Sequence, residues 1–180
     1  TEAADLGQGI RILRQDLWEM IVSFLISQQN NIPRIRRCIS NICERYGERR
    51  QGSGKRVYYT FPGPAALAAA SEEELRDCNL GYRSRYVKKT ARMILDGQVS
   101  LDEVQKMDYP QAREELQKLY GVGAKVADCI CLFALHQMEA FPIDTHIRQA
   151  LEKHYPQGFP FERYKGCSGV MQQYIFYREL

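Results

Sequence analysis

The stretch that decides the fold reads Leu-Tyr-Gly-Val-Gly-Ala-Lys-Val-Ala-Asp-Cys, at residues 119–129. Apolar residues recur at helical spacing on both sides of its turn, over 109–119 and 124–136. The Gly-Val-Gly turn predicts two short helices joined by a tight hairpin, with Val122 pointing inward. The second helix would then present free N–H groups and its positive dipole end, which bind phosphate without reading sequence. The alternative is a plain connection between two helices.

Helical spacing continues through most of the chain. It predicts further helices near 17–28, 33–46, 71–77, 85–96, 144–154 and 170–177. Residues 51–64 are rich in glycine and polar residues and read as an exposed loop, with a brief extended segment at 57–61. Neither strand alternation nor an internal repeat is evident, so the expected fold class is all-α.

Composition and charge narrow the function classes only slightly. Of the 180 residues, 44% are hydrophobic, and the net charge of +3 suits a polyanion without requiring one. No apolar stretch is long enough to cross a membrane, and the start lacks both Met and a signal core. We therefore expect a piece of a longer protein that is not exported. The cysteines form no CxxC pair and predict reduced thiols, at positions Cys38, Cys43, Cys78, Cys129, Cys131 and Cys167.

Lys125 is the candidate nucleophile. It falls in the first turn of the helix after the hairpin, where the positive field lowers the pKa of an amine and partial burial would lower it further. The alternative roles are a phosphate clamp or a solvated surface lysine. Cys129 lies four residues later on the same helix face, so it borders the same pocket or is simply a small core residue.

Asp144 is the candidate catalytic carboxylate, within Phe-Pro-Ile-Asp-Thr-His at residues 141–146. It is a natural N-cap, and a carboxylate here would also face a sugar that develops positive charge at C1′. One residue can fill both roles. His146, two residues on, is a candidate phosphate contact or a helix-surface histidine.

Together, residues 119–129 and 141–146 resemble the helix-hairpin-helix DNA glycosylases, and most closely the 8-oxoguanine DNA glycosylase family. The resemblance runs from about Gly9 to Phe176. It implies a helical glycosylase domain over 1–180, with the hairpin motif at 110–136 and a cleft between two helical lobes. On this resemblance, we expect the family's N-terminal β-rich domain to be absent from this sequence.

The resemblance also implies a mechanism. Lys125 would attack C1′ of a flipped nucleotide and expel the base, while Asp144 stabilises the oxocarbenium-like transition state. β-Elimination from the resulting Schiff base would nick the strand. Cys129, Gln172 and Phe176 would hold the base: Gln172 by hydrogen bonds to its edge, and the other two by covering its faces.

The family's DNA contacts carry over to named positions. Asn30 is the expected filler of the gap left by the flipped base, although the family usually has Asn where Gln29 stands. Tyr82 would wedge into the stack, and Arg34 and Arg83 would hold the orphaned cytosine. The remaining expected DNA contacts are Asn31, Gly121, Val122, Gly123 and His146.

The sequence thus predicts a bifunctional glycosylase and AP lyase acting as a monomer on damaged double-stranded DNA, without a membrane partner. Two alternatives stay open: a monofunctional glycosylase for another damaged base, and a DNA-binding module that uses only the hairpin. We expect no required cofactor and no iron–sulfur cluster, with the hairpin carbonyls as a candidate cation site. The expected location is the nucleoid in a prokaryote and the nucleus in a eukaryote.

Overall fold

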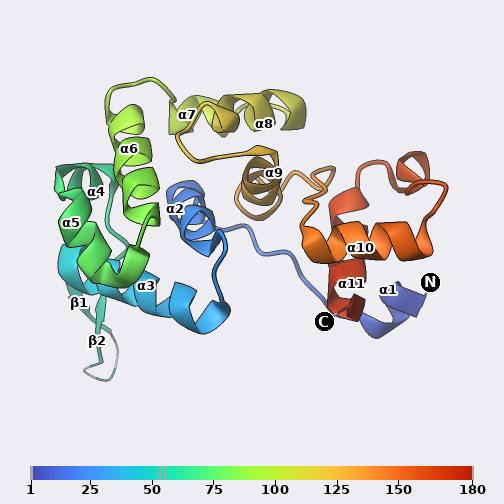
Figure 1. Ribbon diagram of the computed structural model, residues 1–180, viewed down its shortest axis with the longest axis horizontal. Coiled ribbons are helices and arrows are strands. Elements are labelled where there is room, and N and C mark those ends of the chain that lie inside the picture. Colours follow the sequence, from blue (N-terminus) through green and yellow to red (C-terminus); the bar gives the residue numbers. More distant parts are fainter. Residues whose placement is uncertain (1, 53, 55, 180) are drawn as a thin grey trace.

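The helices divide into two lobes that the chain connects twice. The computed structural model describes residues 2–52, 54 and 56–179. In Figure 1, α2 to α9 fill one end of the molecule, and α1, α10 and α11 gather at the other beside both termini. One link precedes α2 and the other joins α9 to α10. The all-α, two-lobed prediction is therefore confirmed.

The larger lobe contains most of the secondary structure. Its elements are α2 (Leu17–Ser27), α3 (Ile32–Tyr46), β1 (Arg49–Gln51), β2 (Val57–Tyr59), α4 (Pro64–Ala69), α5 (Glu72–Leu75), the π-helical turn η1 (Arg76–Leu80), α6 (Arg83–Leu95), α7 (Leu101–Val104), α8 (Tyr109–Gln117) and α9 (Ala124–Phe133). They surround an extended apolar core whose fully buried side chains include Ile21, Leu25, Leu116 and Ile130.

The smaller lobe contains α1 (Glu2–Leu6), α10 (Thr145–His154), the 3-10 turn η2 (Phe161–Tyr164) and α11 (Ser168–Glu179). It has a core of its own, built from Phe141, Ile147, Ala150, Phe159 and Ile175. Each lobe therefore buries its own set of apolar side chains.

Side-chain caps set where most of the long helices begin. Asp16, Asn31, Asp108 and Asp144 each accept a hydrogen bond from a backbone N–H in the first turn of α2, α3, α8 and α10. The predicted capping box at Ser71 is present in α5. Such caps contribute about 1 kcal/mol each, so the sequence positions the helix starts well.

Three features differ from the expectation. Residues 49–51 and 57–59 form a two-stranded antiparallel sheet, pairing Arg49 with Tyr59 and Gln51 with Val57, where only a loop with a brief extended segment was expected. The short helices α1 and α4 were not expected. Helix α9 ends at Phe133 rather than at His136, whose positive φ of 58° is incompatible with a continuing helix.

Candidate active site

The hairpin between α8 and α9 uses its two glycines differently. Gly121 has a φ of +90°, and a Cβ there would lie 2.8 Å from Cγ of Tyr86 in α6. At Gly123, a Cβ would meet open space. Val122 between them is buried, as predicted. Gly121 is therefore required by the fold, whereas Gly123 leaves the start of α9 accessible.

The N-terminus of α9 presents backbone donors beside Lys125. Gly123 occupies the N-cap position without a side-chain hydrogen bond, so the first N–H groups of the helix are open to a ligand. Lys125 is exposed rather than partly buried, and it forms no ion pair with an acidic side chain in the described residues. The expected contribution of burial to its activation is therefore absent.

Asp144 approaches Lys125 from the other lobe. It is the N-cap of α10, and its Oδ1 accepts a hydrogen bond of 2.8 Å from the N–H of Ile147. The carboxylate is half-buried and lines the same cavity of about 190 Å³ as Lys125. The proposed amine and carboxylate thus meet at one cavity, as the sequence predicts.

The walls of that cavity come from both lobes. The larger lobe contributes Phe24 and Phe133, whose rings stack at 5.8 Å, together with Cys129. The smaller lobe contributes Pro142 and α11, with Gln172 and Phe176. We refer to this space, lined by Phe24, Lys125, Cys129, Phe133, Pro142, Asp144, Gln172, Gln173 and Phe176, as the interlobe cavity.

Cys129 forms a neutral wall of the interlobe cavity. Burial raises the pKa of its thiol to about 11; the positive charge of Lys125 opposes this shift, whereas the charges of Asp128 and Asp144 add to it. The thiol therefore stays protonated at neutral pH and offers a soft, polarisable surface to an aromatic ring.

Gln172 supplies a directed amide at the back of the interlobe cavity. It is only 3% exposed; its Nε2 donates to the carbonyl of Pro142 at 2.9 Å, and its Oε1 accepts from Gln173 at 2.6 Å. One N–H and one lone pair remain for a ligand. Phe176, half-buried beside it, meets the exposed His146 edge to face at 6.3 Å. A planar polar ligand matches this combination of amide and aromatic ring.

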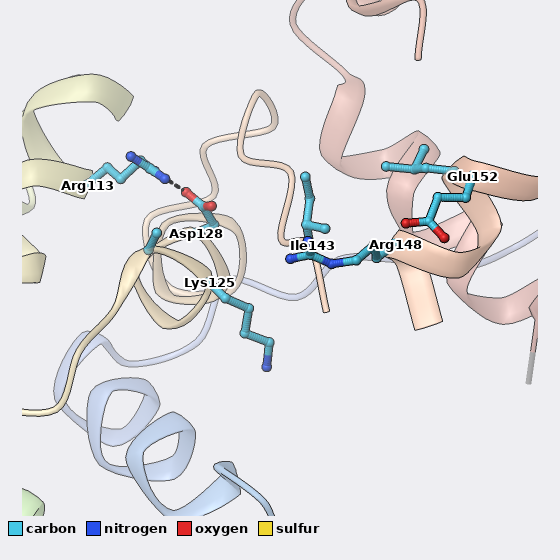
Figure 2. Close-up of a pocket in the computed structure, with 8 residues that line it drawn as sticks. Arg113, Lys125, Asp128, Ile143, Arg148 and Glu152 are labelled. Atoms are coloured by element: carbon cyan, nitrogen blue, oxygen red, sulfur yellow. Dashed lines mark hydrogen bonds and ion pairs between the residues drawn. The ribbon is translucent and has the colours of Figure 1, made fainter. Parts of the chain in front are cut away.

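A second cavity of about 430 Å³ flanks Lys125 on its α8 side. There Asp128 accepts hydrogen bonds from Arg113 Nε at 2.6 Å and from the Tyr109 hydroxyl at 2.8 Å. Burial, with the Asp128 contact, raises the pKa of Tyr109. Figure 2 shows Lys125 extending away from the Arg113–Asp128 pair. This pair ties α8 to α9 without neutralising the amine.

A loop from the larger lobe approaches Lys125 from a third side. Residues 27–29 line a cavity of about 470 Å³ together with Gly123, Lys125 and Asp144. Gln28 Nε2 also donates to the Gly121 carbonyl at 3.0 Å, which fixes the loop to the hairpin. Residues 28–31, with Arg34, Tyr82 and Arg83, include those that the sequence predicts to contact the DNA around the orphaned cytosine. We call this set the opposite-base region.

Arg83, predicted as a DNA contact, has a structural role in this structure. It is 2% exposed, and its guanidinium donates to the carbonyls of Gln28 at 2.7 Å and Gln29 at 2.6 Å, as well as to that of Leu80. These donors hold the loop here, and contact of Arg83 with the DNA stays a prediction. Tyr82, by contrast, is 46% exposed, in keeping with the predicted wedge.

The loop tip is Gln29 rather than Asn30. Asn30 is half-buried; its amide donates to the Ile26 carbonyl at 2.9 Å and its Oδ1 accepts from the N–H of Asn31. Gln29 is exposed and has a left-handed φ of 47°, which projects it from the loop. That Asn30 fills the gap stays a prediction, and the exposed Gln29 is a second candidate for the same role. No sequence signal separates the two, because the difference lies in the backbone conformation.

Asn31 and Arg34 lie apart from the interlobe cavity. Asn31 caps α3 by accepting from the N–H of Arg34 at 3.0 Å. Both side chains line a separate cavity of about 320 Å³ with Pro33, Arg37 and Asn79. Arg34 is exposed and donates to the Asn79 carbonyl at 3.3 Å, a weak bond that leaves most of its donors available. Arg37 was not predicted as a site residue.

All six cysteines lack disulfide bonds, as expected for reduced thiols. In the described part of the chain, no cluster of three or more His, Cys, Asp or Glu side chains has a geometry suited to a metal ion. Within the same residues, no helix combines the length and apolar character needed to cross a membrane.

Comparisons with known proteins identify the family of the chain. Residues 22–158 match the family described as HhH-GPD superfamily base excision DNA repair protein. The chain is 35% identical over 159 residues to the N-glycosylase/DNA lyase of Saccharomyces cerevisiae, covering 82% of this chain and 42% of that protein. It is 32% identical to a probable N-glycosylase/DNA lyase of Methanothermobacter thermautotrophicus over 84% of this chain and 54% of the relative.

A solved structure shares the whole architecture. The Clostridium acetobutylicum 8-oxoguanine glycosylase/lyase, in complex with double-stranded DNA containing cytosine opposite 8-oxoG, superposes with a TM-score of 0.90 at 38% identity. The match covers 98% of this chain and 64% of the clostridial chain. The chain thus spans less than two thirds of the length of these relatives.

Proposed function

Because the chain belongs to the HhH-GPD superfamily of base excision DNA repair proteins, we propose that it removes 8-oxoguanine from duplex DNA and then nicks the strand. The observation that carries the proposal is that Lys125 and Asp144 line one cavity with Cys129, Gln172 and Phe176. The names of the yeast and clostridial relatives support the combination of glycosylase and lyase activity.

The first step breaks the bond between the base and C1′. The Lys125 amine, in its unprotonated form, donates its electron pair to C1′, and the base leaves with the electrons of the glycosidic bond. Positive charge develops on the sugar as this bond lengthens. The Asp144 carboxylate, fixed by its hydrogen bond to the N–H of Ile147, stabilises that charge without having to reorient.

The second step cleaves the strand. The amine loses its proton as the sugar ring opens, which gives a Schiff base between Lys125 and C1′. Removal of a C2′ proton then expels the 3′ phosphate by β-elimination. Water hydrolyses the imine, releasing an unsaturated aldehyde on the 5′ fragment and regenerating the amine. The accessible donors at the start of α9 would hold a backbone phosphate throughout.

The base must leave the duplex before Lys125 can reach C1′. In the interlobe cavity, Phe176 and Cys129 would cover the faces of the flipped base, and Gln172 would bind its edge. Gln29 and Tyr82, the exposed residues of the opposite-base region, would occupy the space that the base vacates. Arg34 remains the candidate contact to the orphaned cytosine.

The proposed chemistry draws only on side chains and backbone groups, so we propose that it requires no cofactor. One protein molecule contains the amine, the carboxylate and the base cavity, which supports action as a monomer. Because the proposed substrate is duplex DNA, we propose the nucleoid of a prokaryote or the nucleus of a eukaryote as the site of action.

Borohydride trapping tests the function. With a duplex containing 8-oxoguanine opposite cytosine, the wild-type chain should give a covalent adduct, and EDTA should not reduce its yield. Lys125→Gln should give no adduct while binding the duplex within about threefold of wild type. Lys118→Gln is the matched control, because Lys118 is an exposed lysine of the same hairpin that is paired with Glu115.

The outcomes separate the candidate functions. Base release by the wild-type chain without an adduct would replace the proposal with a monofunctional glycosylase. Binding without base release would leave a DNA-binding module. An adduct that persists in Lys125→Gln would refute the role of that lysine.

A further inference from the structure

The hairpin has a second side, which faces α6 and lies away from Asp144. Tyr120, immediately before Gly121, is 36% exposed there. Thr90 Oγ1 donates to the Tyr120 carbonyl at 2.9 Å, and the Tyr86 ring meets the Tyr120 ring edge to face at 5.7 Å. Because a Cβ at Gly121 would clash with Tyr86, the hairpin is seated closely on α6. The position of Tyr120 is therefore fixed relative to the phosphate-binding end of α9.

Two cations of α6 converge on the Tyr120 ring. The Lys89 Nζ lies 4.3 Å from the ring centroid, and the Arg85 Cζ lies 5.8 Å from it. Each cation is attracted to the ring face, but the two repel each other. We call Arg85, Lys89 and Tyr120 the Tyr120 cluster.

The other basic residues of α6 all have partners. Arg83 donates to the loop carbonyls, Lys88 donates to the Ala70 carbonyl at 2.7 Å, and Arg92 is paired with Asp96 at 3.2 Å. By contrast, neither Arg85 nor Lys89 forms an ion pair or a hydrogen bond with a side chain in the residues that the structure describes. The unpaired charges of this helix therefore gather beside the hairpin.

We propose that the Tyr120 cluster binds a second backbone phosphate of the DNA duplex, next to the phosphate held by the start of α9. The proposal rests on the proposed function in binding DNA. An anion between Arg85 and Lys89 relieves their mutual repulsion, and the exposed Tyr120 ring offers a face for the adjoining sugar.

Continuity with the hairpin favours DNA over a separate ligand. Gly123 lies three positions after Tyr120, so at most about 11 Å of chain lies between the two positions. One strand can therefore contact both. The cluster lies on the α6 side, so it extends the footprint along the duplex without touching the reacting sugar.

Salt dependence of DNA binding tests the proposal. The probe is an undamaged 25-base-pair duplex titrated by the wild-type chain at several salt concentrations. In Arg85→Gln with Lys89→Gln, the slope of log K against log salt should fall by about 0.9 for each phosphate that the variant no longer neutralises. The affinity at low salt should fall by about tenfold.

A charge-matched control separates the effect of where the charges lie from the effect of net charge. Arg92→Gln with Lys106→Gln removes the same two charges from exposed residues that are paired with Asp96 and Glu103. This control should keep the wild-type slope. Equal slopes in the two double variants would overturn the proposal.

The chemistry provides a separate readout. With enzyme in saturating excess, the cluster variant should release 8-oxoguanine within about twofold of the wild-type rate, because Lys125 and Asp144 are untouched. If DNA is trapped normally but the cluster variant keeps the wild-type salt slope, the proposal for the Tyr120 cluster fails and the glycosylase–lyase function stands. A reduced slope in a chain that traps no DNA would support the cluster and overturn the glycosylase–lyase function. No binding by the wild-type chain would overturn both.

The ring has its own test. Tyr120→Phe keeps the aromatic face and should retain the wild-type affinity. Tyr120→Leu removes it while keeping an apolar side chain, and should weaken binding to the undamaged duplex by about threefold to tenfold. Equal affinities for the Phe and Leu variants would contradict a role for the ring.

Discussion

The proposed reaction centre, Lys125 with Asp144, and the opposite-base region use their polar side chains in opposite ways. At the reaction centre, Lys125 and Asp144 begin two different helices and face a shared cavity. In the opposite-base region, Arg83 is buried and directs its donors to backbone carbonyls. A basic residue next to a glycine turn is thus available to a ligand in one place and committed to the protein in the other.

The comparison shows that burial decides the role of a polar residue. A buried guanidinium needs hydrogen-bond partners, and the carbonyls of residues 28–29 supply them. An exposed lysine at a helix start has no such requirement. We therefore expect changes at Lys125 and Asp144 to lower activity with little effect on stability, and changes at Arg83 to lower stability.

Asp144→Asn should produce the largest effect. Asparagine can accept the same capping hydrogen bond from the N–H of Ile147, so α10 should keep its stability. The lost negative charge should slow base release by about 100-fold to 1000-fold, as is typical when a charge-stabilising group is removed. Single-turnover rates on 8-oxoguanine duplexes measure this.

A second capping aspartate provides the control for this change. Asp108 caps α8 by accepting from the N–H of Gln111, away from the interlobe cavity. Asp108→Asn should leave the rate of base release unchanged. Equal slowing in both variants would assign the effect to capping rather than to charge.

Arg83→Ala should produce the second largest effect, which is a loss of stability. Its removal leaves the carbonyls of Gln28, Gln29 and Leu80 without their donors. We expect unfolding free energy to fall by about 3 kcal/mol. Urea denaturation followed by circular dichroism measures it. Arg34→Ala, at an exposed position, should change stability by about 0.5 kcal/mol or less; similar losses for both variants would contradict the distinction.

The smallest expected difference is between the Gln29→Ala and Asn30→Ala variants. Gln29→Ala should leave stability nearly unchanged but reduce the preference for cytosine over adenine opposite 8-oxoguanine by about tenfold, equivalent to about 1.4 kcal/mol. Asn30→Ala should lower stability by about 1 kcal/mol, because it removes bonds to Ile26 and Asn31. A lost preference in Asn30→Ala, with Gln29→Ala unaffected, would reverse the assignment of the loop tip.

The sequence predicts that Lys125 and Asp144 lie at one cavity, because local motifs position both residues. Gly123 and Asp144 define two helix starts, and side chains at helix starts point in known directions. The residues of the interlobe cavity at Cys129, Gln172 and Phe176 also meet as the family resemblance implies. Only the exposure of Lys125 differs from the expectation.

The opposite-base region is less predictable because distant contacts shape it. Arg83 bonds to carbonyls more than fifty residues away, and Gln28 bonds to the hairpin across 93 positions. Periodicity and caps contain no information about these pairs. The small β1–β2 sheet was missed for a related reason: its three-residue strands are too short to show an alternating pattern.

The most direct test of the central claim is to locate the covalent bond. After borohydride trapping on 8-oxoguanine DNA, nuclease and trypsin digestion followed by mass spectrometry should place the reduced sugar on Lys125. Tryptic cleavage after that residue should be blocked at the same time. An adduct on any other amine, with Lys125 unmodified, would contradict the account.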